Sequence, residues 1–305
     1  MNVLIAADME GVAGIEDCGE CLPSHPAAYA RGRKLMTDEV LTAIGALREG
    51  GVEHISVGDW HMVGTNIERE RMPDGIEVRP IADLALTEAD PTIAKASGGP
   101  LDAIVMIGHH AKTPSPRGFC SHTFIWDMEL LLDDESLSEV QVYAQALAAE
   151  RIPMLVASGD RWLLEELNDG ELGGARLVPT KEGRGRARAA SRGVDETHAE
   201  LADAIGTALA EPPDLPSARS YPAQMRITLE GEEIANVSVP EPSELLTALA
   251  TGFRASEASR EYRQLARIFP AGHDSWVRSA QRSFGGLVSR PVMRSKERRW
   301  LASAP

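Results

Sequence analysis

The sequence has few cysteines, no long apolar run and no surplus of basic residues. Its three cysteines, an odd and small number, favour a reducing compartment over a disulfide framework. No apolar run reaches the roughly 18 residues that a membrane-spanning helix needs. Residues 1–7 lead straight into acidic residues, without a basic stretch and a long apolar core, so no secretory signal is expected. We therefore expect a cytoplasmic protein that does not act at a membrane.

Acidic residues outnumber basic ones by 46 to 31, which gives a formal net charge of −15. Non-specific binding to nucleic acid needs a basic surface, so no nucleic-acid partner is expected. The 305 residues suffice for one large or two modest domains, with a core that needs no disulfide or structural metal to fold. A metal ion in this protein would therefore serve chemistry.

Short apolar runs alternate along the first two thirds of the chain with segments of helical spacing. The pattern predicts strands at residues 3–7, 54–58, 76–81, 102–107, 153–157 and 175–179. It predicts helices at residues 29–49, 138–150, 161–167 and 195–210. Residues 123–132 would pair as a hairpin or an extended strand, and Ser136 or Ser138 would cap the helix that follows. Such alternation is typical of an α/β fold with a mostly parallel sheet and helices on both faces.

The composition changes near residue 212, where proline, serine and alanine become frequent, as in a linker. We therefore expect an α/β metal-binding catalytic domain at residues 1–212 and a smaller α+β part with a basic tail at residues 213–305. The second part is expected to contain two paired strands and a helix, at residues 224–229, 234–239 and 256–268.

Two further segments stand out by composition. Residues 278–299 are rich in arginine although the chain as a whole is acidic. We interpret them as a mobile tail or a contact between subunits rather than as a binding element. Cys18-Gly19-Glu20-Cys21 is a single CxxC motif in an expected loop, and we interpret it as incidental rather than as a redox or metal site.

Acidic and histidine side chains follow three of the expected strands. Asp8 and Glu10 are two residues apart at a strand end, so they would point the same way and repel each other unless a cation lies between them. His61 follows a second strand, where Asp59 could orient its ring as in zinc sites. His110 follows a third, as one of two adjacent histidines of which we expect one to be a ligand. Ligands of open α/β sheets bind at this edge, so we expect these side chains to meet.

Two more candidates come later in the chain. His122 follows a proline-containing loop and would act as acid, base or oxyanion partner, because the pKa of histidine lies near physiological pH. Glu139 stands in the first turn of an expected helix, where a glutamate often serves only the helix dipole. Taken alone, each candidate is explained at least as well by an ordinary role, as a turn, loop or strand residue or, for Glu139, as a partner of the helix dipole.

Taken together, the candidates form a pattern. Five of the eight histidines lie between His54 and His122, and three follow strand ends near acidic residues. Carboxylates and imidazoles without thiolates suit zinc, manganese or iron in a hydrolytic site. A two-metal site needs a bridging carboxylate and ligands for each ion. Those ligands would come from Asp8, Glu10, His61, His110 and Glu139.

The ordered set of motifs also resembles a known family, the zinc D-aminopeptidases encoded in bacterial dipeptide-transport operons. The resemblance extends over residues 1–181. The motifs that carry it are Ala7–Gly14, Tyr29–Thr37, Gly58–His61, Gly108–Ala111 and Ser121–Thr123. Each motif is weak alone, but their order and spacing together are specific.

The resemblance implies a dinuclear zinc site with two Zn²⁺ ions in each subunit. It implies that Asp8 bridges the ions, that Glu10 and His61 bind one, and that His110 and Glu139 bind the other. His122 matches the family's catalytic histidine. The substrate would be a short peptide or amide with an N-terminal D-amino acid, and the partner a second copy of the chain. Members of the family assemble as ring-shaped decamers, so a homo-oligomer is expected.

A mechanism follows from these expectations. The metal ions would lower the pKa of a shared water molecule, whose hydroxide would attack the scissile carbonyl. His122 would stabilise the oxyanion or pass a proton to the leaving amine.

Other functions remain open from the sequence. The same site could belong to a metal-dependent amidase or esterase that acts on a non-peptide small molecule. A binding or regulatory protein that has lost turnover is a second alternative, although the apparently intact ligand set speaks against it. A nucleotide-binding module is disfavoured, because no glycine-rich phosphate loop follows the first strand.

Overall fold

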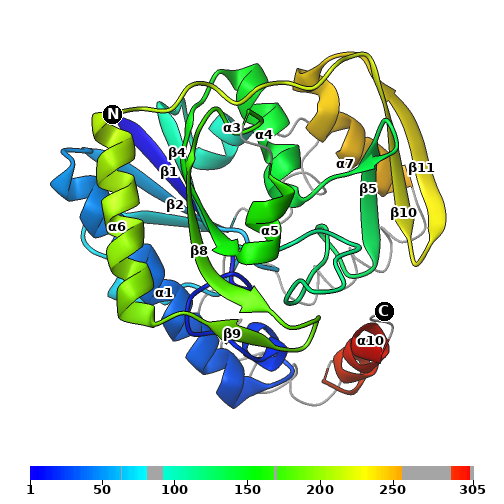
Figure 1. Cartoon of the computed structure of the whole chain (residues 1–305), viewed down its shortest axis with the longest axis horizontal. Coiled ribbons are helices and arrows are strands. Elements are labelled where there is room, and N and C mark those ends of the chain that lie inside the picture. The colour runs from blue at the N-terminus through cyan, green and yellow to red at the C-terminus, as the bar shows by residue number, and fades with distance from the viewer. Residues whose placement is uncertain (63, 81–91, 168–169, 256–289, 303–305) are drawn as a thin grey trace.

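The computed structural model describes residues 1–62, 64–80, 92–167, 170–255 and 290–302. Its main sheet has seven strands in the order β3-β2-β1-β4-β7-β8-β9 (Figure 1). These strands are β1 (Asn2–Ala7), β2 (His54–Asp59), β3 (Glu77–Pro80), β4 (Ala103–His109), β7 (Met154–Asp160), β8 (Arg176–Gly183) and β9 (Ala189–Ser191). Neighbours from β3 to β8 run parallel, and β9 is antiparallel to β8. The predicted mostly parallel sheet is confirmed, and each of its six expected strands is present.

Helices cover both faces of this sheet, as predicted (Figure 1). The α-helices are α1 (Pro26–Glu49), α3 (Ile93–Ser97), α4 (Glu139–Glu150), α5 (Arg161–Glu166), α6 (Val194–Ala210), α7 (Leu245–Ala255) and α10 (Arg290–Ala302). Short 3-10 helices are η1 (Cys18–Cys21), η2 (Arg69–Arg71) and η3 (Pro242–Glu244). No helix within the described ranges is both long and apolar enough to cross a membrane.

The position of β1 in the sheet explains why residues 3–7 are all apolar. Successive side chains of a strand point to opposite faces, so a strand with helices on both sides needs apolar residues at every position. Val3 and Ile5 belong to the cluster formed with α1 and α6. Leu4 and Ala6 belong to the cluster on the other face, which includes residues of α3, α4 and α5.

A second, antiparallel sheet has four strands in the order β11-β10-β5-β6. Its strands are β5 (Met128–Leu132), β6 (Glu135–Ser136), β10 (Ala223–Leu229) and β11 (Glu232–Val239). Strand β5 is the segment for which a hairpin or an extended strand was predicted, and β10 and β11 pair as predicted. Helix α7 contributes to the apolar cluster that also contains residues of β5, β10 and α4. The proposed domain boundary at residue 212 stays a prediction.

Two predictions concern the chain beyond α7. The predicted helix at residues 256–268 lies outside the described residues. Of the arginine-rich segment, the structure describes the part from Arg290 onward, which is helix α10. A mobile tail is therefore the wrong description of this part, because Trp300 and Glu297 of α10 are buried against the chain itself. Figure 1 draws α10 in red below the loops that precede β5.

Candidate metal centre

The carboxyl ends of three adjacent strands bring the predicted residues together. Strand β1 lies between β2 and β4 in the main sheet. Asp8 directly follows β1, His110 directly follows β4, and His61 lies two residues beyond the end of β2. All three side chains are buried. The prediction that these residues meet at one edge of the sheet is confirmed.

Two glycines allow the loop after β1 to approach the end of β4 closely. The backbone N–H of Gly11 donates to the carbonyl oxygen of Gly108 at 2.7 Å. A Cβ on Gly11 would lie 2.0 Å from the carbonyl oxygen of His109, and one on Gly108 would lie 2.3 Å from that of Asp8. Gly108 also has a φ of 72°, which favours glycine. The approach of Asp8 to His109 and His110 therefore depends on the absence of a side chain at Gly11 and at Gly108.

His61 faces the first two carboxylates with one ring nitrogen and the backbone with the other. Its Nδ1 lies 3.0 Å from Glu10 Oε2 and 3.3 Å from Asp8 Oδ1. Its Nε2 lies 2.8 Å from the carbonyl oxygen of Cys21, which can only accept a hydrogen bond. In a neutral ring Nε2 therefore carries the proton, and the lone pair of Nδ1 points at two carboxylates.

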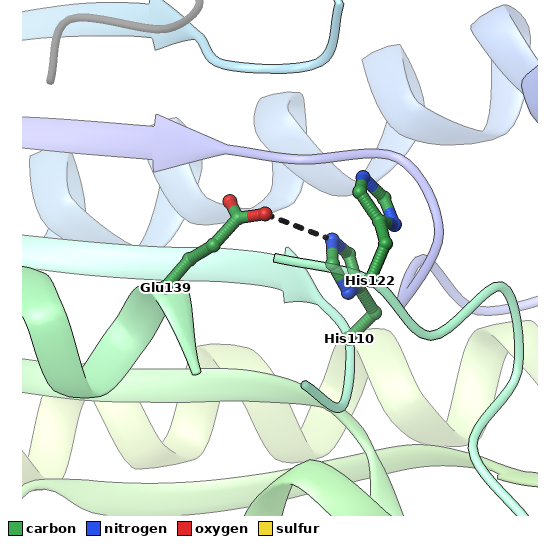
Figure 2. Close-up of side chains that lie close together, drawn as sticks. All are labelled: His110, His122 and Glu139. Carbon is green, nitrogen blue, oxygen red and sulfur yellow. Dashed lines mark ion pairs between the residues drawn. The ribbon is translucent and has the colours of Figure 1, made fainter. Parts of the chain in front are cut away.

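His110 has the corresponding arrangement with the other ring nitrogen. Its Nδ1 lies 3.0 Å from the carbonyl oxygen of Ala111, so Nδ1 carries the proton in a neutral ring. Its Nε2 lies 3.3 Å from Asp8 Oδ2 and 3.5 Å from Glu139 Oε1, and Figure 2 marks the second of these pairs. Asp8 thus presents one oxygen to His61 and the other to His110. This is the position that a bridging carboxylate requires.

Helix α4 places Glu139 at the site. Ser138 caps the helix, since its hydroxyl oxygen accepts from Gln141 N and the Gln141 side chain accepts from Ser138 N. Glu139 is therefore the first residue of α4, and its Oε1 also accepts a hydrogen bond from Phe124 N at 2.7 Å. Burial raises the pKa of Glu139 to about 7, although nearby His110 acts in the opposite direction. The predicted serine cap and the predicted meeting of Glu139 with His110 are both present.

His122 stacks on His110, and its ring also lies near the carboxylate of Glu139. The two imidazole planes are 12° apart and their centroids are separated by 4.0 Å. Figure 2 shows the two side chains next to each other. His122 Nδ1 donates to the carbonyl oxygen of Cys120 at 2.8 Å, which leaves Nε2 as the acceptor in a neutral ring. Burial and the neighbouring His110 hold the pKa of His122 well below its ordinary value.

The first histidine of the adjacent pair also reaches the site. His109 Nδ1 lies 3.8 Å from Asp8 Oδ2, and the ring packs edge-on against Trp60 with centroids 6.2 Å apart. Burial lowers the pKa of His109 to about 4. Both rings of the pair are therefore buried near Asp8, and the expectation that one of them is a ligand stays a prediction.

The donor set fits a metal ion. Within the described residues, three groups of side chains have ligand atoms within 4.8 Å of one another: His110, His122 and Glu139; Asp8, Glu10 and His110; and Asp8, His109 and Glu139. Burial and adjacent Asp8 raise the pKa of Glu10. Burial alone would also raise the pKa of Asp8, but hydrogen bonds with His110 and His61 hold it well below its ordinary value. Buried carboxylates that face imidazole lone pairs are what a divalent cation would stabilise.

Some supporting residues were not found from the sequence. Lys181 is 2% exposed, and its Nζ donates to the carbonyl oxygens of Glu10 and Ile15 at 2.5 and 2.8 Å. Glu39, in α1, accepts a hydrogen bond from Ala13 N at 2.9 Å. Both side chains fix the loop that carries Asp8 and Glu10. A lysine at the end of a strand and a glutamate within a helix carry no local signal for such a role.

Two sequence interpretations change in the structure. Asp59 does not orient the ring of His61, because its carboxylate accepts from Asn66 and Ile67 and so shapes the loop instead. The CxxC segment is a buried 3-10 helix whose thiols are free. The carbonyl oxygen of Cys21 holds the ring of His61, so the backbone of this segment supports the site.

Comparisons with known proteins concern the family and the fold of the chain. A family model described as D-aminopeptidase, peptidase M55, matches residues 1–266. A D-aminopeptidase of Bacillus subtilis strain 168 is 26% identical over 162 residues, which cover 52% of this chain and 56% of that protein. The alignment therefore spans little more than half of that relative. The solved structure of the Zn-dependent D-aminopeptidase DppA from Bacillus subtilis, described as a self-compartmentalizing protease, is similar in fold. Its TM-score is 0.71 at 17% identity, over 84% of this chain and 97% of that chain.

Proposed function

The chain belongs to the D-aminopeptidase family, peptidase M55, and we propose that it is a zinc-dependent aminopeptidase that hydrolyses short peptides or amides. One observation carries the proposal. The lone pair of His110 Nε2 faces the carboxylates of Asp8 and Glu139, and the potential proton carrier His122 stacks on the same ring.

We propose that each subunit binds two zinc ions. Asp8 would bridge them, Glu10 and His61 would hold one, and His110 and Glu139 the other. The separate oxygens that Asp8 presents to His61 and His110 support this assignment. Backbone carbonyl oxygens that fix the opposite nitrogens of both rings support it further, since ligating histidines are usually oriented in this way.

Bound zinc would supply Lewis-acid polarisation of the scissile carbonyl and a water molecule of lowered pKa. The chain's own residues would handle the proton. His122 Nδ1 is occupied by the carbonyl oxygen of Cys120, so Nε2 would accept the proton that the attacking water releases. The same atom would deliver it to the leaving nitrogen. Stacking on His110 keeps the ring in place for both steps.

We propose a substrate with an N-terminal D-amino acid, with its free amino group bound at the acidic side of the cluster near Glu10. The carboxylates of Asp8 and Glu10 lie together there, beside His61, and could pair with a cationic amino group. The structurally similar DppA is described as self-compartmentalizing, and on that basis we propose a homo-oligomer. The decamer that the family resemblance implies is our proposal for its size. The three free thiols support a cytoplasmic location.

Metal content and hydrolysis of D-alanyl and L-alanyl amides, each with and without chelator, test the proposal. About two zinc ions per chain and chelator-sensitive cleavage of the D-substrate are expected. Glu139→Gln should lose about one ion, while Glu165→Gln, at an exposed position of α5, should keep both. Zinc without cleavage of either amide would favour an amidase or esterase with a non-peptide substrate. Failure to bind zinc after it is added back would contradict the site.

A further inference from the structure

Helix α10 lies beyond the residues that the family model matches, yet it packs beside the candidate catalytic histidine. Trp300 of α10 is 2% exposed. Its indole ring meets the ring of His122 at 88°, with centroids 6.5 Å apart. This spacing is that of an edge-to-face aromatic contact. The ring of His122 therefore contacts both the proposed metal ligand His110 and Trp300 of α10.

Several contacts hold Trp300 in this position. Its ring stacks on Trp126 with centroids 4.8 Å apart and planes at 7°. The Arg186 guanidinium lies 4.9 Å from the centre of the indole, and Arg186 Nη1 donates to the Trp300 carbonyl oxygen at 2.5 Å. One turn earlier, buried Glu297 accepts from Ser24 Oγ at 3.2 Å and pairs with His25 Nε2 at 2.7 Å. Two successive turns of α10 are thus anchored to the body of the chain.

The contact lies on the more accessible side of the site. The side chain of Glu139 is 13% exposed, against 2% for His110 and 5% for Asp8. His122 is also partly exposed, whereas His61 and Glu10 are buried. A substrate would therefore reach the carboxylates from the side of Glu139 and His122, which are the more exposed side chains of the site. On that side, the buried ring of Trp300 lies next to His122.

The chemistry of His122 identifies which part of the substrate meets Trp300. In the proposed function, on which this inference rests, His122 Nε2 delivers a proton to the leaving nitrogen. That nitrogen must lie within hydrogen-bond reach of His122. Each further residue of the leaving group would extend the chain by roughly 3.3 Å, into the region where the indole is packed.

We propose that α10 plugs the leaving-group side of the site, and that Trp300 determines specificity by limiting the leaving group to ammonia or a single amino acid. The protein would thus act on amides and dipeptides and discriminate against longer peptides. A buried aromatic side chain, anchored by Arg186 and by the contacts of Glu297, is a steric limit that does not depend on the identity of the acyl group.

Substrates that share one D-alanyl group and differ only in the leaving group test the plug. They are D-alanyl amide, D-alanylglycine, D-alanyl-diglycine and D-alanyl-triglycine. In the full-length zinc enzyme, kcat/KM should fall by about tenfold or more from D-alanylglycine to the triglycine substrate. Trp300→Ala should abolish most of this fall at unchanged zinc content. Trp300→Phe and Arg299→Ala, the latter at an exposed position of the same helix, should keep it.

A second measurement does not depend on activity. Diethyl pyrocarbonate modifies neutral imidazole, and peptide mass spectrometry would report the rate at His122. Trp300→Ala should raise this rate by about tenfold over the wild type, and Arg299→Ala should leave it unchanged. If Trp300→Ala does not fold, Glu297→Gln, which weakens the anchor at His25, should change both readouts in the same direction.

The outcomes separate the two proposals. Cleavage of D-alanyl amide with an unchanged dependence on leaving-group length in Trp300→Ala would overturn the plug and leave the proposed function intact. If the wild type cleaves none of the four substrates, the proposed function fails. The modification rate at His122 then decides, since equal rates in Trp300→Ala and the wild type would overturn the plug. A faster rate in Trp300→Ala would support it.

Discussion

The imidazole rings of His110 and His122 lie almost parallel, with their centroids 4.0 Å apart. His110 and His122 lie at the two ends of one loop. A hydrogen bond from His122 N to the carbonyl oxygen of Ala111, at 3.2 Å, joins these ends. Each ring uses Nδ1 to bind a backbone carbonyl oxygen, so each presents Nε2 toward the site. A proposed ligand and the proposed proton carrier are therefore positioned by the same loop.

Replacement of His122 separates its chemical role from metal binding. His122→Ala should lower kcat by about 100-fold to 10,000-fold, because it removes Nε2, the proposed carrier of the transferred proton. Zinc content, measured by elemental analysis, should stay at the wild-type level, since His122 is not among the five proposed ligands. Retention of full activity by His122→Ala would contradict the assigned role, and loss of zinc would make His122 a ligand.

Replacement of Lys181 tests how the loop after β1 is held. Lys181→Met would leave the carbonyl oxygens of Glu10 and Ile15 without their buried donor, at a cost of about 1–3 kcal/mol in the free energy of unfolding. Zinc affinity should fall by about tenfold or more, because Glu10 would lose its fixed position. Both quantities can be measured by urea unfolding and by competition with a chelator.

Lys34→Met provides the matched control for this variant. The Lys34 side chain is 64% exposed and pairs with Asp38 one turn away on α1, so its loss should change stability by less than about 0.5 kcal/mol. Equal effects of the two substitutions would show that Lys181 does not support the site.

Two glycine substitutions should change the free energy of unfolding in opposite directions. Gly11→Ala would place a Cβ 2.0 Å from the carbonyl oxygen of His109 and should lower the free energy of unfolding by more than about 2 kcal/mol. Gly45→Ala, in the exposed part of α1, meets nothing within 4 Å and should raise stability by about 0.5–1 kcal/mol. Thermal unfolding of both variants checks the prediction. If Gly11→Ala left the free energy of unfolding unchanged, the loop after β1 and the end of β4 could separate without a loss of stability.

The buried carboxyl of Glu39 predicts a pH dependence of stability. Burial raises its pKa from the ordinary 4.5 to about 7, although Ala13 N donates to it. Between these values the folded state binds the proton and the unfolded state has released it, so the free energy of unfolding falls as pH rises from 4.5 to about 7. The loss attributable to this group is up to about 3 kcal/mol.

Glu39→Gln removes this titration but keeps an acceptor for Ala13 N. Urea unfolding of both metal-free proteins at pH 5 and pH 8 should show that the variant becomes more stable relative to the wild type at the higher pH. Other titrating groups are common to both proteins and cancel in the difference. A difference that does not vary with pH would show that Glu39 does not titrate in this range.

The strands, and the proposed metal ligands that directly follow them, could be predicted from the sequence because each signal is local. The run from Val3 to Ala7 is apolar at every position, which only a strand covered on both faces requires. Asp8 and His110 directly follow such runs. In the structure β1 and β4 are neighbours in the sheet, and this order brings Asp8 and His110 together.

Other parts of the site could not be predicted, because they depend on contacts between distant segments. Lys181 reaches Glu10 across 171 positions of the chain, and nothing near Lys181 indicates that contact. Asp59 precedes His61 closely and was expected to orient it, but two backbone N–H groups of a later turn, at Asn66 and Ile67, bind its carboxylate instead. The arginine-rich composition near the chain's end concealed Trp300, whose burial depends on Trp126 and Arg186.

The pairing of β5 with β10 also determines how the polypeptide can be divided. Strand β5 comes from before residue 212, and β10 from after it. A fragment that ends at residue 212 would leave the backbone N–H and C=O groups along one side of β5 without partners, beside apolar Leu130 and Leu132. An uncovered apolar strand edge is a template for association with other chains. Such a fragment would aggregate, although it contains every proposed metal ligand, whereas co-expression with residues 213–305 should restore it to solution.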